Sequence, residues 1–136
     1  MSRYDRLLEH LQRQEDQAQQ VLAALRERRA SHQRQREALA VQRIQAMTTA
    51  GLHDREQLNR FCQRLSGLDA AQQAAITTLE PAETKAQEMV IAAYRRRRSV
   101  EHLADRAADR LRLRGVRRDA RQIDEGAARA WLERAS

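Results

Sequence analysis

Apolar residues recur every three to four positions over most of the chain, which is the period of an amphipathic α-helix. A heptad begun at Tyr4 places six residues at its first position, all apolar except one histidine: Leu11, Ala18, Leu25, His32, Leu39 and Ala46. Further apolar residues lie close to this stripe: Leu7, Leu8, Val21, Leu22 and Ile44. The pattern predicts one helix from about residue 2 to residue 48.

A second heptad begins at Leu58 and keeps its phase to residue 107, as expected of a long coiled-coil helix. Its first position is filled by Leu65, Gln72, Leu79, Ala86, Ala93, Val100 and Ala107. The same seam is expected to include Phe61, Leu68, Ile76, Met89, Val90, Leu103 and Leu111. This predicts a second helix over residues 55–113, kinked at Pro81, which takes an outward position. Beyond Leu113 the pattern weakens through Gly115 and Gly126, and it leaves open whether residues 114–136 are helical or flexible.

The segment between the two helices, residues 49–54, has the residues of a hairpin tip. Gly51 suits the end of the first helix, and Asp54 can cap the second, with Gln57 at the capping-box position. Pairing the helices about Gly51 predicts an all-α, long antiparallel two-helix coiled-coil hairpin, a single elongated domain over residues 1–136.

The predicted pairing sets apolar residues opposite each other along most of the seam. The expected pairs are Leu25 with Ile76, Leu22 with Leu79, Leu11 with Val90, Leu39 with Phe61 and Cys62, and Ile44 with Leu58. The exception is the belt from Arg26 to Arg36, whose opposite stretch offers Asp69, Gln72 and Gln73. That layer is expected to be polar and weaker.

The composition favours long helices over a compact globule. Only one Phe, one Trp and two Tyr are available to fill a core, while 33% of the residues are charged. No apolar run approaches the roughly 18 to 20 residues that span a bilayer, and the N-terminus does not resemble a signal peptide, so we expect no transmembrane segment and a cytoplasmic protein. A single cysteine, Cys62, is expected to be a structural thiol.

Positive charge is concentrated toward the C-terminus. Of the net charge of +7, most lies between Arg95 and Ser136, a segment that contains thirteen arginines and seven acidic residues. This end would attract an acidic partner. The run Arg95–Arg98 could neutralise phosphates or form a solvated face, but Arg96 and Arg97 fall at seam positions. The interleaved acids, the heptads and the scarcity of aromatic residues count against nucleic acid.

No residues with the spacing of a catalytic, cofactor or metal site are found. The four histidines are scattered, and none has another His or Cys at the i,i+4 spacing of a helical metal site. A two-helix structure also offers no pocket to desolvate a carboxylate. We therefore expect no enzymatic activity, no cofactor and no small-molecule substrate, and a protein that contacts other proteins.

The tip and the start of the second helix resemble the FliJ/YscO family of type III secretion and flagellar export proteins. The resemblance rests on Ala50-Gly51-Leu52 and on Leu58, Phe61 and Leu65. It implies a stalk that couples the secretion ATPase, the export gate and substrate chaperones at the inner membrane. The alternatives are a scaffold of another complex and a basic coiled coil that binds nucleic acid.

Two groups of residues are candidates for partner contacts. For the ATPase or another partner at the terminal end they are Arg3, Arg6, Arg95, Arg96, Arg97, Arg98, Val100, Leu103 and Leu111. For the export gate, the resemblance implies Leu39, Gln42, Arg43, Phe61 and Arg64. The stripe from Val100 to Leu111 has no mate in the predicted register. A homodimer, or a fold-back that covers it with Val116, Ile123, Trp131 and Leu132, is the alternative to a partner.

Overall fold

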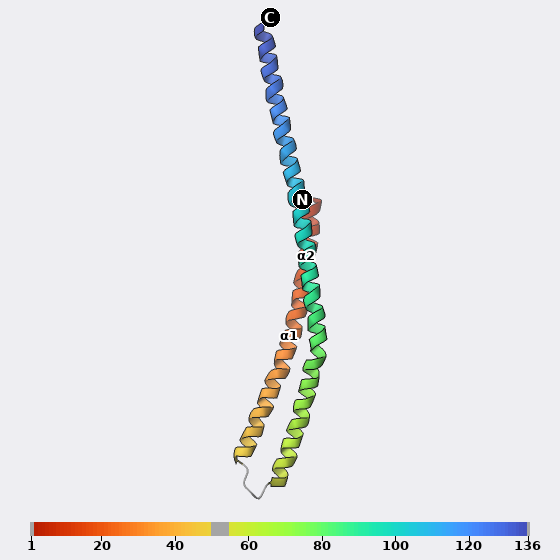
Figure 1. Cartoon of the computed structure of the whole chain (residues 1–136), viewed down its shortest axis with the longest axis vertical. Helices are drawn as coiled ribbons and strands as arrows, with labels where there is room; N and C mark the ends of the chain where they lie inside the picture. The colour runs from red at the N-terminus through yellow and green to blue at the C-terminus, as the bar shows by residue number, and fades with distance from the viewer. Residues whose placement is uncertain (1, 50–54, 136) are drawn as a thin grey trace. The chain divides into compact units, whose positions relative to one another are not determined.

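A computed structural model describes residues 2–49 and 55–135 as two long helices, α1 (Arg3–Thr49) and α2 (Arg55–Ala135), shown in Figure 1. The described residues include no strand, and the two helices pack against each other, which confirms the all-α two-helix fold. The predicted tip glycine, Gly51, and the predicted cap, Asp54, lie outside the described residues.

A capping box fixes the start of α1. The Ser2 backbone N–H donates to Asp5 Oδ2 at 3.0 Å, and the Asp5 backbone N–H donates to Ser2 Oγ at 3.2 Å. These reciprocal bonds satisfy two backbone donors that have no partner within the helix. The bond from the Ser2 backbone also lowers the pKa of Asp5, so the carboxylate that completes the cap stays ionised.

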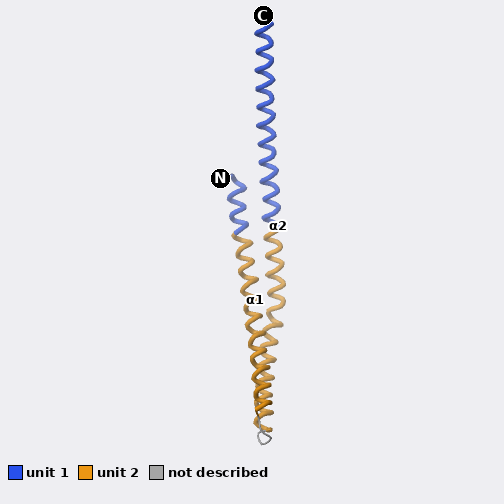
Figure 2. Tube along the Cα trace, turned by 90° about the vertical axis from the view of Figure 1, so that its left-hand side faces the viewer, with its two compact units in different colours: residues 1–12, 95–136 blue, residues 13–94 orange. Residues whose placement is uncertain are grey.

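The chain divides into two compact units, coloured separately in Figure 2. Unit 1 consists of Met1–Gln12 and Arg95–Ser136, and unit 2 is Arg13–Tyr94. Each unit contains part of both helices.

In unit 2 the two helices run antiparallel and cover one narrow seam. The covered side chains fall mainly at the first position of each predicted heptad and at the position four residues later. At these positions the covered residues of α1 are Glu15, Ala18, Leu22, Leu25, Arg29, His32, Arg36 and Leu39. Those of α2 are Leu65, Asp69, Gln72, Ile76, Leu79, Glu83, Ala86, Val90 and Ala93. Two positions per heptad are enough for one partner helix, so the seam is narrow.

Several apolar residues expected at the seam are exposed instead. They are Leu7, Val21, Ile44, Leu68 and Met89. Leu103 and Leu111, which have no mate in the predicted register, are exposed as well. Leu68, Met89 and Leu103 each lie three residues after a first heptad position, whereas the covered neighbour lies four residues after it. The pairing expected between Ile44 and Leu58 therefore fails on the α1 side, where Ile44 is 63% exposed.

The predicted polar belt is confirmed. His32 Nδ1 lies 2.5 Å from Gln72 Oε1, and Arg36 donates to both Asp69 and Gln73. The register differs from pairing about Gly51, which would set Arg36 opposite Leu65, because Arg36 reaches Asp69 one turn farther along α2. The contact gives the Arg36 guanidinium a charge-assisted hydrogen bond, which the apolar Leu65 could not offer.

The helix α2 continues through the residues expected to weaken it. It passes Pro81, Gly115 and Gly126 and extends beyond Leu113 to Ala135. The fold-back considered from the sequence is wrong, because Val116, Ile123, Trp131 and Leu132 belong to this helix and are 62–71% exposed.

Candidate protein-interaction surfaces

The residues predicted for the terminal contact all lie in unit 1, and we call them the terminal surface. They are Arg3, Arg6, Arg95, Arg96, Arg97, Arg98, Val100, Leu103 and Leu111. Arg3 stacks its guanidinium over the Tyr4 ring, 5.5 Å from the centroid, and remains at the surface. The surface therefore draws on both helices of the unit.

Two of the four consecutive arginines bind one carboxylate. Arg97 Nη1 donates to Glu101 Oε1 at 2.5 Å, and Arg98 Nη1 donates to Glu101 Oε2 at 2.8 Å. Burial raises the pKa of Glu101, but the hydrogen bonds and charges of Arg98 and Arg97 outweigh it and lower the pKa below its usual value. Glu101 thus stays ionised and neutralises part of the basic run.

The arginines of the run differ in exposure. Arg97 is half-buried at the seam, as predicted, whereas Arg96 is exposed, so its predicted seam position is wrong. Ala93 is a first heptad position, and the second covered position lies four residues after it, at Arg97. Arg96 lies only three residues after Ala93 and is therefore outside the seam. Arg95 and Arg96 therefore offer exposed positive charge next to the internally paired arginines.

The apolar part of the terminal surface is exposed at its leucines. Leu103 is 50% exposed and Leu111 is 66% exposed, whereas Val100 is half-buried. A neighbouring groove of about 440 Å³ is lined by Asp5, Leu8, Glu9, Gln12, Arg97 and Glu101. This mixed charged and apolar surface suits a protein partner better than a small molecule.

The five residues predicted for the export gate lie in unit 2, and we call them the tip-proximal surface: Leu39, Gln42, Arg43, Phe61 and Arg64. Leu39 and Phe61 are half-buried, and the three polar residues are exposed. The Arg64 guanidinium lies 5.9 Å from the centroid of the Phe61 ring, so these two residues form one contact on α2.

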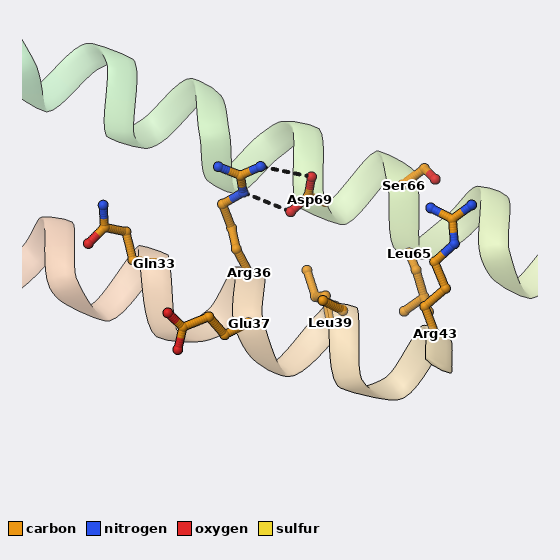
Figure 3. Close-up of a pocket in the computed structure, with 9 residues that line it drawn as sticks. Gln33, Arg36, Glu37, Leu39, Arg43, Leu65, Ser66 and Asp69 are labelled. Carbon is orange, nitrogen blue, oxygen red and sulfur yellow. Dashed lines mark hydrogen bonds and ion pairs between the residues drawn. The ribbon is translucent and has the colours of Figure 1, made fainter. Parts of the chain in front are cut away.

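Two of the five residues line a groove of about 590 Å³ between α1 and α2. Leu39 and Arg43 contribute from α1, and Leu65 and Ser66 contribute from α2. In Figure 3, Arg36 reaches across the groove to Asp69, while Leu39 and Leu65 point into the space between the helices. The lining of the groove therefore combines two leucine side chains with the ion pair of Arg36 and Asp69.

The ion pair in this groove stays charged. The hydrogen bond from Arg36 lowers the pKa of Asp69, and the same bond raises the pKa of Arg36. A partner at the groove would therefore meet a fixed dipole beside the leucines.

The described residues carry no group of three or more His, Cys, Asp and Glu that could hold a metal ion. Within the same residues, neither helix is long and apolar enough to cross a membrane. Cys62 is half-buried and has a free thiol.

Sequence reasoning missed two features. The first is a set of charged residues at seam positions, including the pair of Arg29 Nη1 and Glu83 Oε2 at 2.9 Å. The second is the exposed apolar spacing that begins at Leu113, where the main heptad was expected only to fade. The sequence contains a signal for each feature. Opposite charges on the two predicted helices indicate the first, and apolar residues spaced alternately by three and four positions indicate the second.

A family model described as "Flagellar FliJ protein" matches residues 1–136. Comparison with curated proteins and with solved structures gave no match. The family match covers both helices and both surfaces described above.

Proposed function

Because this chain belongs to the flagellar FliJ protein family, we propose that it is the stalk of a type III export apparatus. In this role it connects the secretion ATPase, the export gate and substrate chaperones through its paired helices. It works in the cytoplasm, at the inner-membrane base of the apparatus, and catalyses no reaction itself.

The terminal surface is proposed to contact the ATPase. The observation that carries this proposal is the exposure of Leu103 and Leu111 on the helix that also carries the exposed Arg95 and Arg96. Burying one leucine contributes roughly 1.5 to 3 kcal/mol, so a partner that covers both leucines gains several kcal/mol. The adjacent arginines favour an acidic lining on that partner.

The tip-proximal surface is proposed to contact the export gate. Leu39 and Arg43 line the groove, and the Phe61–Arg64 contact adds an aromatic ring and a positive charge. Aromatic and arginine side chains are frequent at the energetic centre of protein interfaces.

The test is a double substitution, Leu103→Ser with Leu111→Ser, assayed with purified secretion ATPase. Both side chains are exposed, so the helical circular-dichroism signal and the melting temperature should change little. Stimulation of the ATPase and binding to it should be lost. The matched control is Leu68→Ser with Met89→Ser, two exposed apolar residues of unit 2 outside both surfaces, which should bind normally.

Two outcomes would contradict the assignment. If the double variant melts at a much lower temperature, the leucines belong to the protein's own core. If it binds and stimulates the ATPase as the wild type does, the terminal surface is not the contact.

A further inference from the structure

An apolar stripe runs along the part of α2 that follows Leu111. Six residues spaced alternately by three and four positions form it, and we call it the distal stripe: Leu113, Val116, Ala120, Ile123, Ala127 and Ala130. All six are exposed, and Val116 and Ile123 are 65% and 71% exposed. This spacing is that of a coiled-coil seam.

The distal stripe lies on the opposite side of α2 from the half-buried face formed by Val100, Ala104 and Ala107. With 3.6 residues per turn, the next positions of that face after Leu111 are Arg114, Arg118 and Arg121. The face that packs against α1 in unit 1 therefore continues as a basic face, and the apolar residues move to the other side. The distal stripe is a second, separate apolar face.

We propose that the distal stripe is a homodimer interface in which the α2 helices of two copies pair antiparallel, with Ala120 of each copy facing Ile123 of the other. The same register sets Leu113 opposite Ala130 and Val116 opposite Ala127. Each layer joins a larger side chain to an alanine, so two identical stripes fill the interface evenly when their directions are reversed.

The charges beside the stripe favour the antiparallel direction. In this register Arg117 flanks Asp124 of the other copy, and Arg112 flanks Glu133. Trp131, which is 69% exposed, lies beside Arg110 of the other copy, where a cation–π contact can form. Symmetry repeats each of these contacts once.

A parallel pair would bring like charges together. Flanking positions in a parallel coiled coil are five residues apart, which sets Arg112 against Arg117 and Asp119 against Asp124. Arg112 also donates to Asp109 within its own chain, but an exposed pair of this kind opposes a new contact only weakly.

The flanking acids also argue against a lipid surface as the occupant. A helix that binds anionic lipid carries mainly Lys and Arg beside its apolar face, whereas Asp119 and Asp124 border this one. The interface leaves Leu111 on the other side of the helix, so the inference goes beyond the proposed ATPase contact and does not depend on it.

A charge-swap series tests the pairing with the full chain in sedimentation-velocity runs over a range of concentrations. We expect a concentration-dependent dimer for the wild type. Arg117→Asp alone and Asp124→Arg alone should each weaken it roughly tenfold, because two attractive pairs become repulsive. Mixing the two variants should restore dimers, since each mutated residue then meets its opposite charge.

The control Arg118→Asp makes the same change of charge one residue away, on the opposite face, and should dimerise as the wild type does. A monomer at all concentrations overturns the proposal. Equal weakening by Arg117→Asp and Arg118→Asp also overturns it. Dimerisation would then depend on net charge and not on the proposed contact between Arg117 and Asp124.

Disulfide trapping tests the direction in a chain with Cys62→Ser. Leu113→Cys and Ala130→Cys chains should form a mixed disulfide when combined and little disulfide alone. If each forms disulfides with itself alone, the helices are parallel and the proposed register is wrong.

Discussion

Arg36 of α1 and Asp69 of α2 form a two-pronged pair, with Nε donating to Oδ1 at 2.8 Å and Nη2 donating to Oδ2 at 3.3 Å. Each side chain is 39–40% exposed, so the pair lies at the margin of the seam in contact with water. A paired guanidinium and carboxylate recognise each other by shape as well as charge, so the contact fixes which turn of α2 faces Arg36. It is the clearest marker of the helix register in unit 2.

This pair predicts a loss of stability in acid. Because the Arg36 hydrogen bond holds the pKa of Asp69 below its usual value of 3.8, the unfolded chain takes up the proton first as the pH falls. The contribution is present above pH 3.8 and disappears as the pH falls through the lower pKa of the folded state. Melting temperatures measured by circular dichroism at pH 7 and pH 2 should therefore differ less in Asp69→Asn than in the wild type.

Asp119→Asn is the matched control for that experiment, because Asp119 is an exposed acid on the part of α2 beyond Leu111. Its pH response should follow the wild type. If Asp69→Asn and Asp119→Asn lose stability in acid to the same extent as the wild type, the Arg36 pair contributes nothing measurable.

Leu65 and Leu68 lie one turn apart on α2, and replacing each of them tests how narrow the seam is. Leu65 is 5% exposed and Leu68 is 54% exposed, although both were expected at the seam. Leu65→Ala should lower the free energy of unfolding by about 2 to 3 kcal/mol, because it leaves a cavity between the helices. Leu68→Ala should change it by less than about 0.5 kcal/mol, as is usual for surface positions. Urea unfolding followed by circular dichroism measures both, and equal losses would contradict the narrow seam.

Much of the fold could be predicted because the first heptad positions alone specify two amphipathic helices. Leu11, Leu65 and Ala86 are buried where the pattern expects them. The pattern does not specify the second seam position, since apolar residues occur both three and four residues after the first. Polar residues such as Asp69 and Glu83 take the covered position, and only their partners on α1 reveal why.

The candidate surfaces were less predictable than the fold. Periodicity indicated that Leu103 and Leu111 lack an internal mate, and both are exposed. It did not separate Arg96 from Arg97, because a one-residue step on a helix turns the side chain by about 100° and moves it from seam to solvent. The segment after Leu113 resembled a fading signal because its apolar face changes sides.

Pro81 predicts a gain in stability on substitution. Proline in a helix interior lacks the N–H that would bond the Thr77 carbonyl, and its ring crowds that carbonyl. Pro81 is exposed and within α2, so Pro81→Ala should raise the free energy of unfolding by up to about 3 kcal/mol. Thermal melts of unit 2 variants in the full chain would show the increase.

Gly67→Ala provides the comparison for Pro81→Ala. A Cβ at Gly67 meets nothing within 4 Å in the described structure, so this substitution should stabilise by about 1 kcal/mol through helix propensity alone. A gain at Gly67 without one at Pro81 would mean that the seam requires the local geometry that proline imposes.

The pair of Arg29 and Glu83 predicts an asymmetric response to mutation. Their Nη1–Oε2 distance is 2.9 Å, but the Glu83 side chain is only 12% exposed against 39% for Arg29. Within the described part of the chain, the buried Glu83 Oε1 has no hydrogen-bond partner. Glu83 thus depends on Arg29 for compensation, whereas Arg29 still reaches water.

Arg29→Leu should therefore destabilise by about 2 kcal/mol, since it leaves a covered carboxylate without its cation. Glu83→Leu should be nearly neutral, and the double variant should recover most of the loss. Arg34→Leu is the matched control, because Arg34 and Glu27 form an exposed pair at 2.8 Å that contributes little. Urea unfolding of the four variants forms a double-mutant cycle with one control. Equal losses from Arg29→Leu and Glu83→Leu would mean that the two side chains share the same environment, which contradicts the difference in their exposure.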